Sequence, residues 1–162
     1  MANKSEKEKK RALKSQKKTL KRQLKRTIAE KHDIKGFKPN VTMAVHWFRR
    51  LNRALFNSRL GGVHIEVKKI HADWGRCIAN WDNRKTPRGR FDQRVIPYHI
   101  PVTYKIQLIT KYPRWKDFIE TLAHEMVHLY QMTVMKDPFS NHNHNFYAFR
   151  NKFRAVGLRL YR

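Results

Sequence analysis

The chain has a single cysteine, Cys77, and no long apolar run. One thiol cannot form a disulfide within the chain, and it cannot supply the several cysteines of a zinc ribbon. The N-terminal stretch MANKSEKEKKRALK lacks the apolar core of a signal peptide, and no later segment has the apolar length that spans a bilayer. These absences predict an intracellular, cytoplasmic protein that is not secreted and has no membrane partner.

Acidic residues are also scarce. The chain has 12 Asp and Glu against 37 Lys and Arg, which gives a formal net charge of +25 at pH 7. This charge exceeds what solubility requires, so it favours a polyanionic partner, nucleic acid before membrane. With 162 residues the chain can bury one core. We therefore expect one folded domain with a basic tail.

Residues 1–40 form the predicted tail. They carry 15 Lys and Arg against 4 Asp and Glu, and Phe37 is their only aromatic residue. Such a composition does not build a core. Four apolar side chains nevertheless follow a helical spacing of seven, four and four: Leu13, Leu20, Leu24 and Ile28. The tail is therefore either disordered, a solvated helix that frays when alone, or a helix that orders on nucleic acid or another partner.

The boundary is predicted at KGFKPN, residues 35–40, so that the folded domain covers 41–162. A polar, basic loop at 82–94 is a second candidate contact with nucleic acid. The predicted nucleic-acid contacts in the tail and this loop are Lys10, Arg11, Lys17, Lys18, Lys21, Arg22, Lys25, Arg26, Arg84, Lys85, Arg88 and Arg90. Aromatic residues interspersed with arginines, Trp74 among them, favour single-stranded nucleic acid, whereas Trp47 and Trp81 are expected to fill the core.

The pattern beyond residue 40 predicts an α+β domain. Apolar residues at helical spacing indicate a helix over 43–57, capped by Thr42. Alternating patterns then predict strands at 63–70, at 74–81 and within 95–108, the last at a sheet edge because it contains prolines. Two further helices follow. The expected architecture is an N-terminal helix, a small antiparallel or mixed sheet, and two C-terminal helices.

The stretch TLAHEMVHLY, residues 121–130, places His124 and His128 four residues apart, with Glu125 beside the first. Residues four apart lie on the same face of a helix, so both imidazoles can reach one metal ion. Glu125 is rotated by about a hundred degrees from His124. That position suits a residue that does not bind the ion but acts as general base on the attacking water of a zinc hydrolase.

A catalytic zinc site needs a third protein ligand, and two common candidates are missing. The metzincin pattern requires glycine at position 131 and histidine at 134, where this chain has Gln131 and Val134. No glutamate follows Glu125, so a downstream glutamate ligand is excluded as well. The candidates that remain are Asp137, His142 and His144.

His142 is the favoured third ligand. Ser140 or Asn141 can cap a new helix, in which His142 shares the buried face with the phenylalanines that follow it. His144 lies about two hundred degrees round that helix, and it remains the alternative ligand. Three neutral imidazoles and one water complete a site for a single catalytic Zn²⁺. His144 and Tyr147 are also candidates for stabilising the oxyanion of the tetrahedral intermediate.

The ordered set of motifs resembles the SprT-like family of zinc metallopeptidases over most of residues 41–158. LNRALFNSRL is similar to that family's opening helix, DWGRC to its Gly-Arg-Cys strand, and ETLAHEMVHLY to its catalytic helix. NHNHNFYAFRNKFRAVGL resembles its closing helix, and this alignment places the third ligand on His142. The chain departs from the family at Asn143, where glycine is usual, and it lacks the C-terminal zinc ribbon of some bacterial members.

The resemblance implies a minimal zincin-like fold and a zinc-dependent endopeptidase. Eukaryotic members degrade proteins crosslinked to DNA, and compact members are familiar from tailed bacteriophages, which implies the cytoplasm or nucleoid of a host cell. We therefore predict a peptidase that acts on proteins associated with DNA or RNA. Its substrate peptide is expected to add to the edge strand at 95–108. Two alternatives remain: a nucleic-acid-binding accessory protein with a structural or vestigial zinc site, and a peptidase for a soluble substrate.

Overall fold

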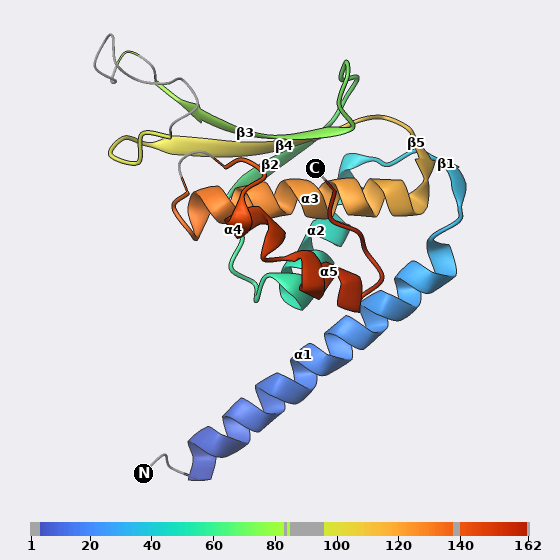
Figure 1. Ribbon diagram of the computed structural model, residues 1–162, viewed down its shortest axis with the longest axis vertical. Helices are drawn as coiled ribbons and strands as arrows, with labels where there is room; N and C mark the ends of the chain where they lie inside the picture. The colour runs from blue at the N-terminus through green and yellow to red at the C-terminus, as the bar shows by residue number, and fades with distance from the viewer. Residues whose placement is uncertain (1–3, 83, 85–95, 138–139, 162) are drawn as a thin grey trace.

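Helix α3, Trp115–Thr133, lies at the centre of the fold (Figure 1). The computed structural model describes residues 4–82, 84, 96–137 and 140–161. A three-stranded sheet covers one side of α3, and helices α2, α4 and α5 lie on the other. The helix is buried along most of its length because apolar side chains face both layers, with Phe118, Leu122 and Met126 fully enclosed. The predicted α+β architecture is confirmed.

The sheet has the strand order β2-β4-β3. Strand β2, Val63–Val67, runs parallel to β4, Val102–Leu108, and β3, Gly75–Trp81, runs antiparallel to β4 on its other side. The third predicted strand is therefore central, and its prediction as an edge was wrong. The prolines that suggested an edge, Pro97 and Pro101, precede β4 and take no part in its hydrogen-bonding ladder. Strand β2 is also shorter than predicted and ends at Val67.

Helix α2, Val41–Leu55, begins and ends two residues earlier than predicted. Its cap is Asn40, whose side-chain oxygen accepts a hydrogen bond from the backbone N–H of Met43 at 2.8 Å. The prediction of Thr42 as the cap was wrong because Asn40 already satisfies the first free N–H group.

Residues 4–31 form one long helix, α1, Lys4–Lys31. Its N-terminal half projects from the body, and its C-terminal half packs against α2 (Figure 1). Leu24 and Ile28 are only 2% and 3% exposed and join the core, contrary to the expectation that this segment contributes none. Strand β1, Lys35–Phe37, then pairs antiparallel with β5, Tyr112–Arg114. The division of the chain at residue 40 stays a prediction.

The C-terminal part contains two short helices, α4, His144–Tyr147, and α5, Arg150–Ala155. The cap of α4 is Asn143, so the predicted caps at Ser140 and Asn141 were wrong. Asn143 has a φ of −98° and needs no glycine, and its side-chain oxygen accepts from the N–H groups of Asn145 and Phe146. His142 therefore precedes the helix that was expected to carry it.

In the part of the chain that the structure describes, no helix combines the length and the apolar character needed to cross a membrane.

Candidate metal centre

Three histidines from two elements point at one another. His124 and His128 lie one turn apart on α3, and His142 approaches them from the loop before α4. Each Nε2 atom is 3.2 Å from the other two. Nitrogen ligands of a tetrahedral zinc ion at about 2.0–2.1 Å lie roughly 3.3 Å apart, so the triangle has the size that such an ion requires.

The charge state of the rings also fits a cation. Burial and the neighbouring His128 and His142 together lower the pKa of His124 to about 3. Burial and His142 lower the pKa of His128 to about 4. Both rings are therefore neutral at pH 7, and a neutral imidazole has the lone pair that binds a metal.

Phe146 forms the apolar floor of this triangle. Its ring is fully buried, and its centroid lies 4.9 Å from the ring centroids of both His124 and His128 and 4.6 Å from that of His142. The phenylalanine restricts all three rings at once. This contact explains why the closing segment has an apolar residue four positions after His142.

Two of the three rings, those of His124 and His128, also form hydrogen bonds with groups outside the triangle, which hold the rings in place. The ring of His124 donates to the backbone carbonyl of Tyr161, which raises its pKa slightly against the larger effect of burial. The Nδ1 atom of His128 lies 3.0 Å from Oε1 of Gln131 and 3.3 Å from Oγ of Ser140. Partners of this kind orient the ligands of metal sites and increase their basicity.

Glu125 is buried next to the triangle, on the side of β3. Burial and then Asp73 raise its pKa to about 8, against the opposing effect of a hydrogen bond from the backbone N–H of Cys77. A nearby cation would favour the carboxylate. The glutamate therefore has the two properties of a general base beside a metal: it lies close to the ion's position, and its proton affinity is high.

A cleft of about 500 Å³ opens in front of these groups. Four of the chain's 12 acidic residues line it: Asp73, Asp117, Glu120 and Glu125. Asp117 and Thr121 continue the helix face of His124 and His128 at spacings of four, three and four, a periodicity that is visible in the sequence but did not enter the predicted site. Arg159 and Tyr161 also line the cleft, and no periodic pattern marks them.

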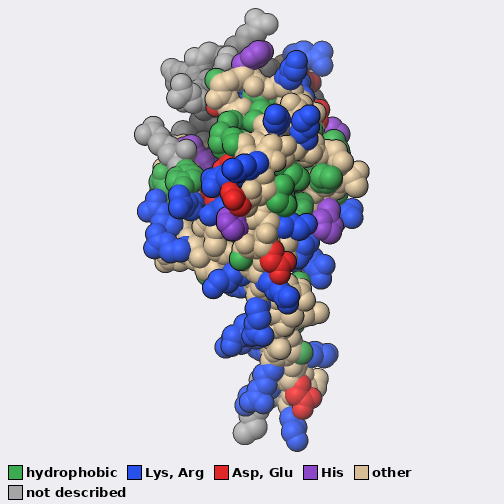
Figure 2. Space-filling view, turned by 90° about the vertical axis from the view of Figure 1, so that its right-hand side faces the viewer, with side chains coloured by type: hydrophobic (Ala, Val, Ile, Leu, Met, Phe, Trp, Pro, Cys, Tyr) green, Lys and Arg blue, Asp and Glu red, His purple; other side chains and the backbone are tan. Residues whose placement is uncertain are grey.

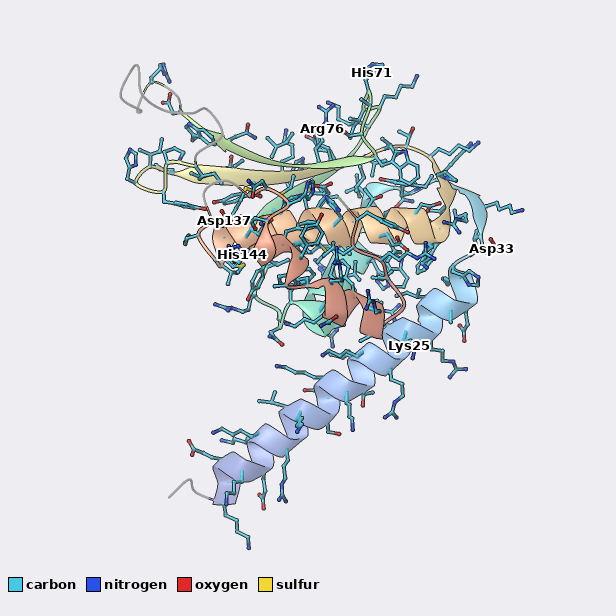
Figure 3. The ribbon with its side chains drawn as sticks, in the orientation of Figure 1. Lys25, Asp33, His71, Arg76, Asp137 and His144 are labelled. Atoms are coloured by element: carbon cyan, nitrogen blue, oxygen red, sulfur yellow. The ribbon has the colours of Figure 1, made fainter. Side chains whose placement is uncertain are left out.

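The other predicted site residues are not brought together in this way. His144 begins α4 (Figure 3) and is exposed, and it does not belong to the cluster of His124, His128 and His142. Tyr147 is half-buried, with the guanidinium of Arg150 4.5 Å above its ring. Neither belongs to the described residues that line the cleft, so this placement lends no support to an oxyanion role.

The predicted nucleic-acid contacts on α1 are exposed, and Figure 2 shows Lys and Arg side chains covering the projecting helix. Arg84 is exposed and paired with Asp82 at 3.0 Å. Lys85, Arg88 and Arg90 lie outside the described residues. Trp47 is buried as expected, whereas Trp74 is 48% exposed and lines the cleft.

Comparisons with known proteins agree with the resemblance seen in the motifs. A model of the SprT-like family matches residues 44–160, which covers most of the chain and includes the three histidines and Glu125. No curated protein matches the chain.

Proposed function

The chain belongs to the SprT-like family, and on that premise we propose that it is a zinc-dependent endopeptidase that acts on proteins associated with nucleic acid. The observation that carries the proposal is the triangle of three Nε2 atoms, each 3.2 Å from the others, with Glu125 buried beside it. Three histidines are the protein ligands of one class of catalytic zinc site, and the adjacent glutamate has the position of its general base.

Each group has a distinct role in the proposed reaction. Bound zinc would polarise the scissile carbonyl and acidify the attacking water. His124, His128 and His142 would hold the ion through Nε2. Glu125 accepts the proton of the attacking water on its carboxylate and then donates that proton to the leaving amine. Its high proton affinity in the buried site supports the first of these steps.

The substrate backbone is proposed to add to β3 and not to β4. Strand β4 is paired on both sides, so it has no edge to offer. None of the described strands pairs with the outer edge of β3, and this strand begins at Gly75, which lines the cleft beside Glu125. Addition of a peptide at such an edge would satisfy main-chain hydrogen bonds and draw the peptide across the site.

Two distributions of charge support a substrate bound to nucleic acid. Of the described residues that line the cleft, four are acidic and one, Arg159, is basic in a chain that carries +25, so the cleft is an acidic part of a basic protein and suits cationic peptide segments. Three of these carboxylates also pair with neighbouring basic side chains, Asp73 with Arg76, Asp117 with Arg114 and Glu120 with Lys116. Proteins that bind nucleic acid are rich in cationic segments. Helix α1 presents exposed lysines and arginines (Figure 2) and contributes none of the described residues that line the cleft, so these side chains can pair with phosphates.

Cleavage of a small, basic DNA-binding protein by the zinc-loaded chain tests the proposal, with and without single-stranded DNA. We expect cleavage that DNA stimulates and that Glu125→Gln abolishes without loss of zinc or DNA binding. Equal cleavage by Glu125→Gln would contradict the role of the glutamate. Binding of zinc and DNA without cleavage of any such protein would favour a nucleic-acid-binding accessory protein.

A further inference from the structure

Gln131 is fully buried, at 0% exposure, yet it carries a polar amide three residues after His128. Both ends of this amide have partners. Its Oε1 lies 3.0 Å from Nδ1 of His128, and its Nε2 donates to the carbonyl of Asn141 at 2.9 Å and to Oδ1 of Asn143 at 3.2 Å. Buried amides without partners are costly, so this set of contacts explains how an amide is tolerated in the core.

The direction of these hydrogen bonds is determined by one group. The carbonyl of Asn141 can only accept, so the NH₂ end of Gln131 must face it. The oxygen of Gln131 then faces His128, and Nδ1 of His128 must carry the proton. The lone pair of that ring is thereby placed on Nε2, the atom that points at the other two histidines.

The same amide holds the loop that carries His142. Asn141 and Asn143 are the residues immediately before and after His142, and Gln131 donates to both. Asp137 supports the arrangement, because its Oδ2 accepts from Nδ2 of Asn143 at 2.8 Å and from Nδ2 of Asn145 at 3.2 Å.

We propose that Gln131 is a positioning residue of the metal centre, which fixes the tautomer of His128 and holds the loop of His142 through the backbone carbonyl of Asn141 and the side chain of Asn143. One side chain on α3 thus sets the spacing between the helix ligands and the loop ligand. This inference rests on the proposed function, because it assumes that the three histidines bind zinc. The role needs a side chain that both accepts and donates: an ionised glutamate cannot donate, and methionine has no donor and only a weakly accepting sulfur.

The test is the zinc affinity of Gln131→Met, measured by competition with a chromogenic chelator. Partners that orient metal ligands typically contribute about 10–100-fold in affinity, so we expect a loss of that size. The matched control is Met132→Leu, a neighbouring position on α3 that is 4% exposed and is not part of this network. It should bind zinc as the native chain does. The melting temperature of the metal-free proteins reports folding separately.

A second readout does not depend on zinc. In the metal-free native protein, ¹⁵N spectra of the imidazoles should show His128 as the Nδ1–H tautomer, and in Gln131→Met the two tautomers should mix. If Gln131→Met does not fold, Gln131→Asn is measured instead, since its shorter side chain keeps an amide but cannot reach His128 and Asn141 together.

The outcomes separate this inference from the proposed function. Weaker zinc binding with mixed tautomers would support the positioning role. Native affinity and a native tautomer in the variant, even with a lower melting temperature, would show that Gln131 is structural only and would overturn the inference alone. A native protein that binds no zinc would overturn the metal centre and the inference with it.

Discussion

Gly75 of β3 lies against Thr121 and Glu125 of the central helix with no room for a side chain, so Gly75→Ala should be destabilising. A Cβ atom at this position would lie 2.7 Å from Cγ2 of Thr121 and 3.3 Å from both the carbonyl oxygen of Gln107 and Cγ of Glu125. Thr121 cannot easily turn its methyl group away, because its hydroxyl donates to the carbonyl of Asp117 at 2.7 Å. The strand itself must therefore move.

The size of the effect follows from this geometry. Carbon atoms in contact are separated by about 3.5–4.0 Å, so β3 and α3 must separate by roughly 1 Å. Overpacking of this kind typically costs about 1–3 kcal/mol. At about 2–4 °C per kcal/mol for a chain of this size, the melting temperature should fall by roughly 2–12 °C. A displacement of about 1 Å at Glu125 can also cost about a hundredfold in turnover.

Thermal unfolding of the metal-free proteins measures the predicted fall in melting temperature, with Gly61→Ala as the control. No atom lies within 4 Å of a Cβ at Gly61, and its backbone does not adopt a positive φ. Gly61→Ala should be neutral or stabilising by about 0.4–1 kcal/mol, through the reduced entropy of the unfolded chain. If Gly75→Ala melted at the same temperature as Gly61→Ala, the close packing of β3 on α3 would be refuted.

The site and α1 lead to three further predictions. Phe146→Ala should lower the free energy of unfolding by about 3–5 kcal/mol and weaken zinc binding, as measured by urea unfolding and chelator competition; unchanged affinity would refute its role as the floor of the triangle. In the metal-free protein, His124 and His128 have pKa values of about 3 and about 4, below the unfolded value of about 6.5. The unfolded state therefore binds more protons as the pH falls below about 6.5, and these two groups destabilise the fold towards pH 4. Glu125 has the opposite effect, because its pKa of about 8 lies above the unfolded value, so the free energy of unfolding should rise as the pH falls from 8 to 6.5. Glu125→Gln should remove that rise. Urea unfolding between pH 8 and pH 4 checks both signs, and a flat profile would contradict them. Replacing three exposed lysines of the projecting helix, Lys10, Lys14 and Lys18, by glutamine should reduce the salt dependence of DNA binding by about one unit of slope per lost phosphate contact, with zinc content unchanged. An unaltered slope would exclude this surface as a DNA contact.

The local features of the site could be predicted from the sequence. His124 and His128 share a helix face because residues four apart always do, and the phenylalanines after His142 marked a buried segment. Strand β3 was predicted within a residue of its bounds, since alternation is a local pattern. The central helix followed from its apolar stripe in the same way.

The features that depend on distant contacts could not be predicted. Strand order places β4 in the middle of the sheet, and nothing in its own residues distinguishes a central strand from an edge. Tyr161 reaches His124 only because the segment after α5 returns to α3. Gln131 served in the sequence only to exclude the metzincin pattern, because its partners lie in a loop ten and twelve residues away.

The zinc content of the native chain, His142→Ala and His144→Ala tests the proposed metal centre most directly. Mass spectrometry under native conditions gives the number of ions per chain without a substrate. We predict one zinc ion in the native chain and in His144→Ala, and a severe loss in His142→Ala. Loss of zinc from His144→Ala together with its retention in His142→Ala would contradict the proposed site, and so would a native chain that binds no zinc.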